Sequence, residues 1–215
     1  MLYPIPAVPV PSPPPPPLEE VGLEVERVGR QVAWHRPFAE AADDRGPVLL
    51  LFHGNGENLE TLRRAGVLAA FDDLGRPYLA IDYPGYGQSA GSPSEPHLLA
   101  GGRAAAAWMR QRYEGRQIVP VGWSLGAAVA IQLVAGGEAQ GLVAISPWTS
   151  LEAIGSDHFP AWLVGLVVRE RYDSLAAAPR VERPALVIHG ERDRIIPVEH
   201  GRRVAAALPE ARWVE

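Results

Sequence analysis

The sequence contains neither cysteine nor lysine. With no Cys among its 215 residues, disulfides, thiolate zinc sites and a cysteine nucleophile are excluded. The 20 basic residues are therefore all arginine, which excludes Schiff-base chemistry and any cofactor held through a lysine. Reactions that need a thiol or a side-chain amine of the protein are therefore excluded for this chain.

A surplus of positive charge and a long apolar run are also missing. The formal net charge is −5 and no arginine-rich run occurs, so nucleic acid is not an expected partner. The apolar stretch at residues 159–168 has about half of the roughly 18 residues that span a bilayer. Prolines from Pro4 onward interrupt any signal-peptide core. We therefore expect a cytoplasmic protein without an integral membrane segment.

The composition is that of one globular domain preceded by a proline-rich arm. Apolar residues make up 47% and charged residues 21% of the chain, a mix that supports a sizeable core. Nine of the first 17 residues are proline, five of them consecutive, which favours extended polyproline II structure. We predict a disordered arm over residues 1–20, either a solvated tail or a ligand for an SH3-like groove, and a domain over residues 21–215.

From residue 21 onward, short apolar runs alternate with helical stretches. Residues 21–28 and 31–34 predict a leading hairpin. Continuous apolar runs, of the kind buried on both faces of a parallel sheet, occupy residues 48–52, 78–83, 118–121, 142–145 and 186–188. The predicted fold class is α/β, with a mostly parallel central sheet and helices on both faces. Chemistry is expected at the carboxyl ends of the strands.

Residues 147–184 are too long for a simple connection and predict a small cap over the site. Capping boxes at residues 92–95 and 149–152 predict two helix starts, the second of them inside the cap. Apolar residues of the cap are candidates for an acyl pocket, although such residues also pack cap helices against a domain. The candidate pocket residues are Trp123, Trp148, Phe159 and Trp162.

The segment Gly122-Trp123-Ser124-Leu125-Gly126 joins a predicted strand to a helix-forming run that begins at Ala127. A serine at a sharp strand-to-helix turn exposes its hydroxyl, and flanking glycines let the strained turn close. The helix N-terminus also favours negative charge at that place. The pattern predicts Ser124 as a nucleophile; a glycine-rich turn with a capping serine is the alternative.

Two more strand ends carry candidate site residues. At the end of run 48–52, the backbone N–H of Asn55 could join that of Leu125 to bind the oxyanion of a tetrahedral intermediate. After run 186–188 comes Asp193, 69 residues beyond Ser124, placed to orient a histidine. The alternative for the segment of Asn55 is an ordinary turn. The alternative for Asp193 is a loop aspartate held in a salt bridge. The other candidate acids are Glu191 and Asp173.

Together these segments resemble the α/β-hydrolase superfamily, in particular small-capped serine hydrolases of the serine-aminopeptidase-like or lysophospholipase-like branch. The resemblance covers nearly everything after residue 21 and runs through residues 50–55, 82–89, 122–126, 146–150, 172–175 and 189–197. It implies that Ser124 is the nucleophile and Asp193 the acid. It also implies an oxyanion hole formed by Asn55 and Leu125.

The sequence departs from the family pattern at the histidine. In such proteins a loop after the last strand carries the triad histidine and leads into a final helix, whereas here the last strand is expected at residues 211–215. Of the six histidines, only His200 follows Asp193. We expect His200 to be a solvated residue in the first turn of a helix and a weak candidate base. The sequence therefore predicts a C-terminally truncated hydrolase domain.

Two functions follow from these residues. The first is hydrolysis of a carboxylic ester or related acyl bond through an acyl-enzyme at Ser124, with a small-molecule acyl substrate and without metal or organic cofactor. Without a triad histidine, such activity is expected to be impaired in this chain. The second is a non-catalytic pseudohydrolase that binds an acyl or other small ligand, or serves as a scaffold, without turnover.

Overall fold

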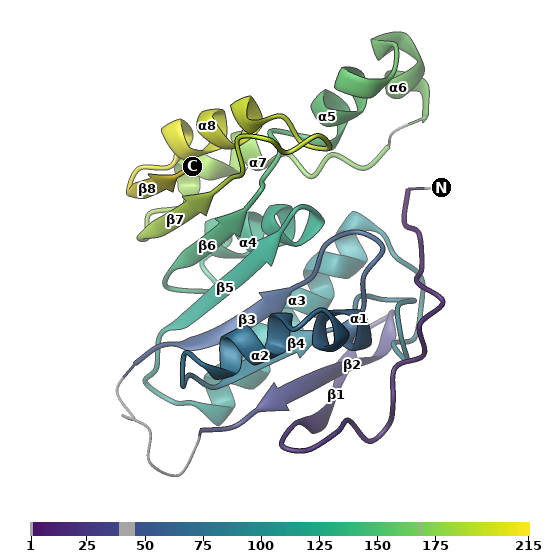
Figure 1. Cartoon of the computed structure of the whole chain (residues 1–215), viewed down its shortest axis with the longest axis vertical. Helices are drawn as coiled ribbons and strands as arrows, with labels where there is room; N and C mark the ends of the chain where they lie inside the picture. Colours follow the sequence, from purple (N-terminus) through teal and green to yellow (C-terminus); the bar gives the residue numbers. More distant parts are fainter. Residues whose placement is uncertain (1, 39–45, 168) are drawn as a thin grey trace.

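An eight-stranded sheet organises the molecule (Figure 1). The structure is a computed structural model that describes residues 2–38, 46–167 and 169–215. The strand order is β1-β2-β4-β3-β5-β6-β7-β8. The strands are β1 (Glu19–Val25), β2 (Gly29–Arg36), β3 (Val48–Phe52), β4 (Tyr78–Ile81), β5 (Ile118–Trp123), β6 (Leu142–Ile145), β7 (Ala185–Ile188) and β8 (Ala211–Val214). Strand β2 pairs antiparallel with β1 and β4, and every other pairing is parallel.

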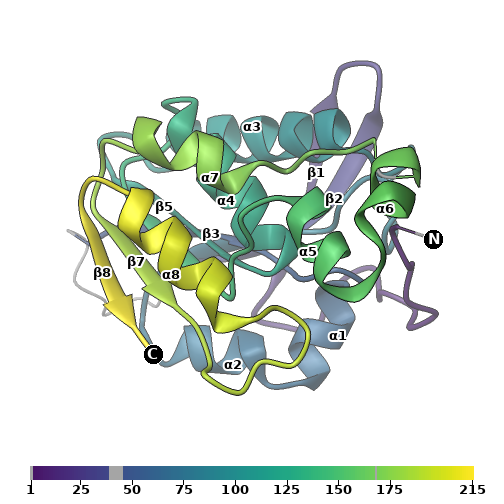
Figure 2. The same ribbon diagram turned by 90° about the horizontal axis from the view of Figure 1, so that it is seen from above.

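Helices cover both faces of this sheet (Figure 2). They are α1 (Leu59–Arg64), α2 (Val67–Asp72), α3 (Glu95–Arg112), α4 (Leu125–Ala135), α5 (Leu151–His158), α6 (Ala161–Val167), α7 (Ser174–Ala177), a 3-10 turn (Ala178–Arg180) and α8 (Val198–Ala207). Helices α3, α4, α7 and α8 share one face, whereas α1 and α2 lie on the other. Helices α5 and α6 project beyond the carboxyl ends of the strands (Figure 1).

The central strands form because both of their faces are covered. All five residues of β3 are buried, and alternate residues contribute to the two apolar clusters on opposite faces of the sheet. The predicted α/β class and mostly parallel sheet are confirmed. The predicted strand 78–83 ends at Ile81, and the next residue, Asp82, accepts the Leu59 N–H on its carboxylate at 2.9 Å and so supports the start of α1.

Both predicted capping boxes are displaced along the chain. Helix α3 is capped by Ser94, whose hydroxyl accepts the His97 N–H, so the box predicted to begin at Ser92 is wrong by two residues. Helix α5 is capped by Ser150, and Thr149, the predicted cap, instead contacts His200. In each segment two hydroxyl residues offered a cap, and the second of them forms it.

The proline-rich arm lies along the domain, which differs from the disordered arm expected from composition. Residues 2–17 contain no helix or strand, as expected for polyproline-like chain. Val10 is nevertheless 6% exposed and packs into the apolar cluster of α1 and α2. Side-chain amides of the domain bind the arm's carbonyl oxygens. Composition alone did not reveal these contacts because they depend on residues more than 40 positions away.

Among the helices of the described ranges, none has both the length and the apolar character needed to cross a bilayer.

Candidate active site

Ser124 occupies a strained turn between β5 and α4. Its backbone has φ 56° and ψ −116°, a conformation that is costly for a residue with a Cβ and persists only where the surroundings enforce it. The Ser124 N–H donates to the Ile145 carbonyl at 2.9 Å, which ties the turn to the end of β6. The side chain makes no capping hydrogen bond to α4. The hydroxyl is therefore not a helix cap, the alternative that the sequence left open.

The flanking glycines are required by close backbone contacts. A Cβ on Gly122 would lie 2.1 Å from the Gly126 carbonyl oxygen, and a Cβ on Gly126 would lie 2.2 Å from the Phe52 carbonyl oxygen. Real Cβ atoms are not found at such distances. The second contact joins the start of α4 to the end of β3, so it also holds the Ser124 turn against the loop that begins at His53.

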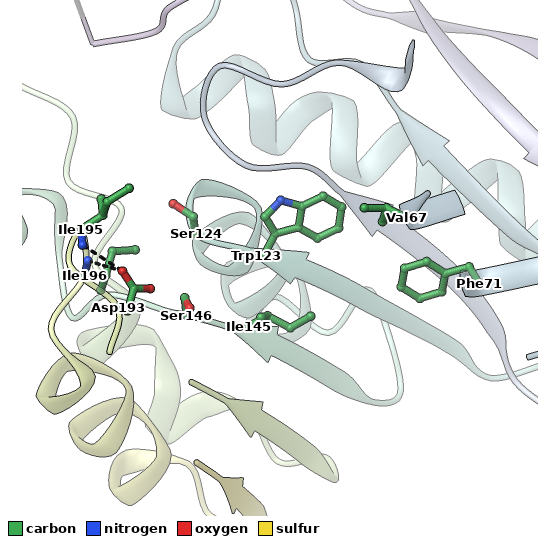
Figure 3. A pocket seen from close by; sticks show the side chains of 9 residues that line it. All are labelled: Val67, Phe71, Trp123, Ser124, Ile145, Ser146, Asp193, Ile195 and Ile196. Atoms are coloured by element: carbon green, nitrogen blue, oxygen red, sulfur yellow. Dashed lines mark hydrogen bonds between the residues drawn. The ribbon is translucent and has the colours of Figure 1, made fainter. Parts of the chain in front are cut away.

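A cavity of about 440 Å³ opens beside Ser124 (Figure 3). Its lining residues are Val67, Phe71, Trp123, Ser124, Ile145, Ser146, Asp193, Ile195 and Ile196. The Trp123 ring points toward Val67 and Phe71 of α2, whereas the Ser124 hydroxyl points toward the loop of Asp193 (Figure 3). The cavity thus has an apolar end at α2 and a polar end at Ser124 and Asp193.

The Asp193 carboxylate is fixed by its own loop. Its Oδ1 atom accepts the backbone N–H groups of Ile195 at 2.9 Å and Ile196 at 3.0 Å. Burial raises the pKa of this carboxyl, but the two backbone donors, the Ser146 hydroxyl and nearby His189 outweigh burial and hold the pKa below its ordinary value. Asp193 is therefore ionised at neutral pH. The alternative acids are engaged elsewhere: Asp173 caps α7, and Glu191 is an exposed partner of Arg192.

The loop after β3 is held through Glu57. One carboxylate oxygen of Glu57 accepts the Gly54 N–H at 2.7 Å and the Trp123 indole N–H at 2.6 Å. The Asn55 side chain points the other way: its amide donates to the Leu2 carbonyl at 2.8 Å and its oxygen accepts the Tyr86 hydroxyl at 3.1 Å. The Asn55 side chain is thus engaged with the arm and Tyr86, and Asn55 is not among the residues that line the cavity.

Leu125 is the first residue of α4. The first N–H groups of a helix have no partner within the helix and carry its positive dipole end. The Leu125 N–H is therefore suited to the role of an anion donor next to Ser124.

No histidine of the described chain is hydrogen-bonded to Ser124. His53 is fully buried, packs against Tyr83 with the two rings tilted by 48°, and lies 3.5 Å from the Asp82 carboxylate. The Nε2 atom of His189 donates to the Ile196 carbonyl at 2.9 Å and so supports the Asp193 loop. The remaining four are partnered with other groups: His35 with Tyr113, His97 with Ser92, His158 with Ile195 and His200 with Asp157.

His200 differs from its predicted environment. It lies in the first turn of α8 as predicted, but it is 7% exposed, so the expectation of a solvated side chain is wrong. Its Nδ1 accepts the Thr149 N–H at 3.1 Å, and its Nε2 lies 2.6 Å from the Asp157 carboxylate. Both ring nitrogens are therefore occupied in a contact between α8 and the cap.

Most of the predicted pocket aromatics do not line the cavity. Trp148 is buried and donates its indole N–H to the Tyr172 carbonyl at 3.2 Å. Phe159 and Trp162 are 62% and 74% exposed on the cap. Only Trp123 of the four lies in the lining. The sequence did not reveal Val67 and Phe71, because α2 was not recognised as an element that reaches the site.

A family model for the alpha/beta hydrolase fold matches residues 47–167, which include β3, the Ser124 turn and most of the cap. The chain belongs to the α/β-hydrolase family. The predicted family and fold are thus confirmed. Among the described residues, no group of three or more His, Asp or Glu side chains converges as a metal site.

Relatives of this hydrolase occur in bacteria and animals. An uncharacterized protein of Mycobacterium tuberculosis is 34% identical over 193 residues, covering 89% of this chain and 67% of the relative. The human protein ABHD12B is 26% identical, with 82% of this chain and 53% of that protein covered. The zebrafish lysophosphatidylserine lipase ABHD12 is 24% identical, with 85% and 52% covered. The chain spans about half the length of these two animal relatives.

Solved structures share the architecture of this hydrolase. The Pyrococcus furiosus esterase Pf2001 superposes with a TM-score of 0.73 at 20% identity, covering 99% of this chain and 87% of the esterase. Est1E from Butyrivibrio proteoclasticus, in a structure with ferulic acid bound, superposes with a TM-score of 0.71 at 15% identity, covering 90% and 88%. At these identities the likeness establishes the fold.

Proposed function

We propose that this α/β-hydrolase is a cytoplasmic serine hydrolase that cleaves a carboxylic ester or related acyl bond through an acyl-enzyme at Ser124. One observation carries the proposal: Ser124, on a strained turn without a capping hydrogen bond, and ionised Asp193 open on the same mostly apolar cavity. Nucleophiles of this type are held at such turns with the hydroxyl exposed. Structural serines at helix starts instead use the hydroxyl as a cap.

In the proposed reaction, the Ser124 oxygen attacks the carbonyl carbon while a base removes the hydroxyl proton. The carbonyl electrons move to its oxygen, which accepts the backbone N–H groups of Leu125 and Asn55. Collapse of this intermediate expels the alcohol, which takes the proton back from the base. Water then repeats the sequence on the acyl-enzyme and releases the acid and free Ser124.

The role of Asp193 in this scheme is to orient the base and stabilise its positive charge. None of the histidines of the described chain contacts Ser124, so the proposal assigns the base to a histidine outside residues 1–215. The apolar end of the cavity at Val67 and Phe71 would take the acyl chain, since an alkyl group is favourably transferred there from water. A small-molecule ester with an apolar acyl group is therefore the proposed substrate class, with no metal or organic cofactor.

The missing histidine contact also favours a second candidate function, a pseudohydrolase that binds an acyl ligand in the same cavity without turning it over. A serine without a base retains only the effects of binding and of the oxyanion hole, about 10³ to 10⁴ over water in serine proteases of another fold. Binding without turnover would then be the activity of the site.

The test measures hydrolysis of p-nitrophenyl butyrate by the 215-residue chain, by the protein made from the full reading frame, and by their Ser124→Ala variants. The proposal expects turnover in the full-frame protein that is lost with Ser124, and a rate lower by several orders of magnitude in the 215-residue chain. Turnover that survives Ser124→Ala would overturn the assignment. Saturable ester binding without turnover in every form would establish the pseudohydrolase.

A His200→Ala variant of the 215-residue chain completes the experiment. Because both ring nitrogens of His200 are engaged with Thr149 and Asp157, we expect the substitution to leave the residual rate unchanged. Robust hydrolysis that disappears with His200 would instead make His200 the base and leave the triad complete within this chain.

A further inference from the structure

The arm's backbone carbonyls are bound by three side-chain amides of the domain. Asn55 donates to the Leu2 carbonyl at 2.8 Å, Asn58 to the Val8 carbonyl at 2.8 Å, and Gln88 to the Val10 carbonyl at 2.5 Å. Polyproline-like chain has no internal hydrogen bonds, and proline has no N–H, so its carbonyls are the backbone groups left to bind. The domain thus presents hydrogen-bond donors to the free backbone carbonyls of a proline-rich segment.

Side-chain packing accompanies these hydrogen bonds. Pro4 lies against Gly56, where an added Cβ would come within 3.3 Å of the proline ring. Val10 packs so closely on Gly87 that a Cβ there would lie 2.9 Å from the valine. Gly56 and Gly87 both have positive φ, 80° and 53°. The arm therefore fits two turns of the domain that lack side chains.

The first residues of the arm are anchored by Tyr3. Its hydroxyl is 2.9 Å from that of Tyr172, a fully buried side chain in the cap segment. Burial raises the pKa of Tyr3 well above its ordinary value, with the Tyr172 contact acting in the opposite direction. Tyr3 is thus a neutral anchor at physiological pH. Figure 1 shows the N-terminal segment running along the side of the molecule past α1 and β2.

The anchored segment touches the loop that carries a proposed oxyanion donor. Asn55 has its side-chain amide on Leu2 and its side-chain oxygen on the Tyr86 hydroxyl, and the next residue, Gly56, packs on Pro4. An oxyanion donor acts only if its N–H is already aimed at the reacting oxygen. The orientation of the Asn55 peptide is set partly by the arm, because the arm binds the side chain of the same residue.

We infer that residues 2–10 form a strap that positions the oxyanion loop, with Leu2 and Tyr3 as its positioning residues. This inference rests on the proposed function for the consequence in turnover, but not for the contact itself. The strap contributes no residue to the cavity. It acts through Asn55, so its loss should lower kcat and leave KM nearly unchanged.

The experiment compares full-length Tyr3→Ala with Ile5→Ala, a matched control in the same segment whose side chain is 53% exposed. A third form lacks residues 1–3 and so loses the Leu2 carbonyl itself. We expect kcat for p-nitrophenyl butyrate, and the rate at which a fluorophosphonate modifies Ser124, to fall about 10-fold in Tyr3→Ala and in the shortened form. This is less than the roughly 10² or more for a lost donor, because the N–H is loosened and not removed. Tyr3→Phe loses the hydroxyl bonded to Tyr172 but keeps the ring that packs against the core, so its rate should lie between those of wild type and Tyr3→Ala.

Hydrogen exchange of the Asn55 and Gly56 amides provides a readout that does not depend on catalysis. We expect faster exchange at these two amides in Tyr3→Ala and in the shortened form, with Ile5→Ala unchanged. Unchanged exchange there would overturn the strap, whatever the activity. Faster exchange with an unaltered rate of Ser124 modification would also overturn it, since the loop would then move without consequence for the site. If wild-type Ser124 neither reacts nor turns over, the proposed function fails while the exchange still tests the contact.

Discussion

The two loops that flank Ser124 are held in different ways. The loop of residues 53–58 is fastened from several directions: Glu57 binds its backbone, Tyr83 donates to the His53 carbonyl, and Asn58 caps α1. The loop of residues 189–197 is held by the Asp193 carboxylate and by two histidines, His189 and His158, that bind its carbonyls. Its Ile195 side chain is 73% exposed. The first loop is thus packed into the core, whereas the second loop is arranged around the Asp193 carboxylate.

This difference matches what each loop has to do in the proposed reaction. A backbone N–H that stabilises an oxyanion must be aimed before the substrate arrives, since reorganisation would cost part of the stabilisation. A carboxylate that orients a base needs a fixed charge and position, which two backbone N–H groups supply. The rest of the second loop is then free to present apolar surface at the cavity, as Ile195 and Ile196 do.

The largest effect is expected at Gly126, where the Ser124 turn meets the first loop. We expect Gly126→Ala to destabilise the domain by about 3 kcal/mol or more, because overpacking against backbone atoms cannot be relieved by a side-chain rotation. The new Cβ would lie 2.2 Å from the Phe52 carbonyl oxygen and 2.8 Å from that of His53. Urea unfolding followed by circular dichroism measures the loss.

Gly101→Ala is the matched control for that variant. Gly101 lies inside α3 and a Cβ there would meet nothing within 4 Å, so we expect a gain of about 0.5 to 1 kcal/mol from helix propensity. Equal unfolding free energies for Gly126→Ala and wild type would show that the turn and the first loop are not packed as described.

The next effect concerns the carboxylate that joins the first loop to Trp123. Glu57→Ala should cost about 1 to 3 kcal/mol, since it leaves the Gly54 N–H and the Trp123 indole N–H without their acceptor. We also expect kcat to fall about 10-fold through a looser oxyanion loop. Glu57→Gln retains an acceptor oxygen and should recover most of both losses; a Gln variant as impaired as Ala would point to the charge and not to the hydrogen bonds.

Sequence predicted the sheet better than the surroundings of the site. The runs 48–52 and 142–145 coincide with β3 and β6, because strands covered on both faces must be apolar along their whole length. The Ser124 turn was recognisable for a similar reason: Gly122 is required by its contact with the Gly126 backbone four residues on, although Gly126 itself is required by the distant Phe52 carbonyl. A local requirement of this kind can be recognised from a short stretch of sequence.

The features that sequence did not reveal depend on distant partners. Phe71 reaches the cavity because of where α2 packs, not because of its neighbours in sequence. His200 is buried because Thr149 and Asp157 converge on it from the cap. Trp162 belongs to an apolar run like those of the core, yet it is exposed. Whether an apolar or polar side chain faces the site, the core or solvent is decided by the fold as a whole.

The smallest predicted effect is a pH dependence of the unfolding free energy that comes from the second loop. The folded-state pKa of Asp193 is lowered, because the backbone donors, the Ser146 hydroxyl and His189 outweigh burial. The stability that this ionised carboxylate contributes is therefore present above the unfolded-state pKa, about 4, and is lost as pH falls through the lower folded-state pKa. We expect the unfolding free energy of wild type to exceed that of Asp193→Asn at pH 6, and the difference to shrink toward pH 3.

Glu191→Gln is the control for this titration, because Glu191 lies in the same loop but its side chain is 66% exposed and pairs only with exposed Arg192 in the described structure. Exposed pairs of this kind contribute little, so its difference from wild type should stay small from pH 3 to pH 7. The decisive quantity is the change with pH, since Asn can still accept the Ile195 and Ile196 N–H groups and the offset at any single pH mixes several effects. If the difference in unfolding free energy between wild type and Asp193→Asn stays constant over this range, the ionisation of Asp193 does not contribute to stability. The two loops would then differ in exposure but not in their use of charge.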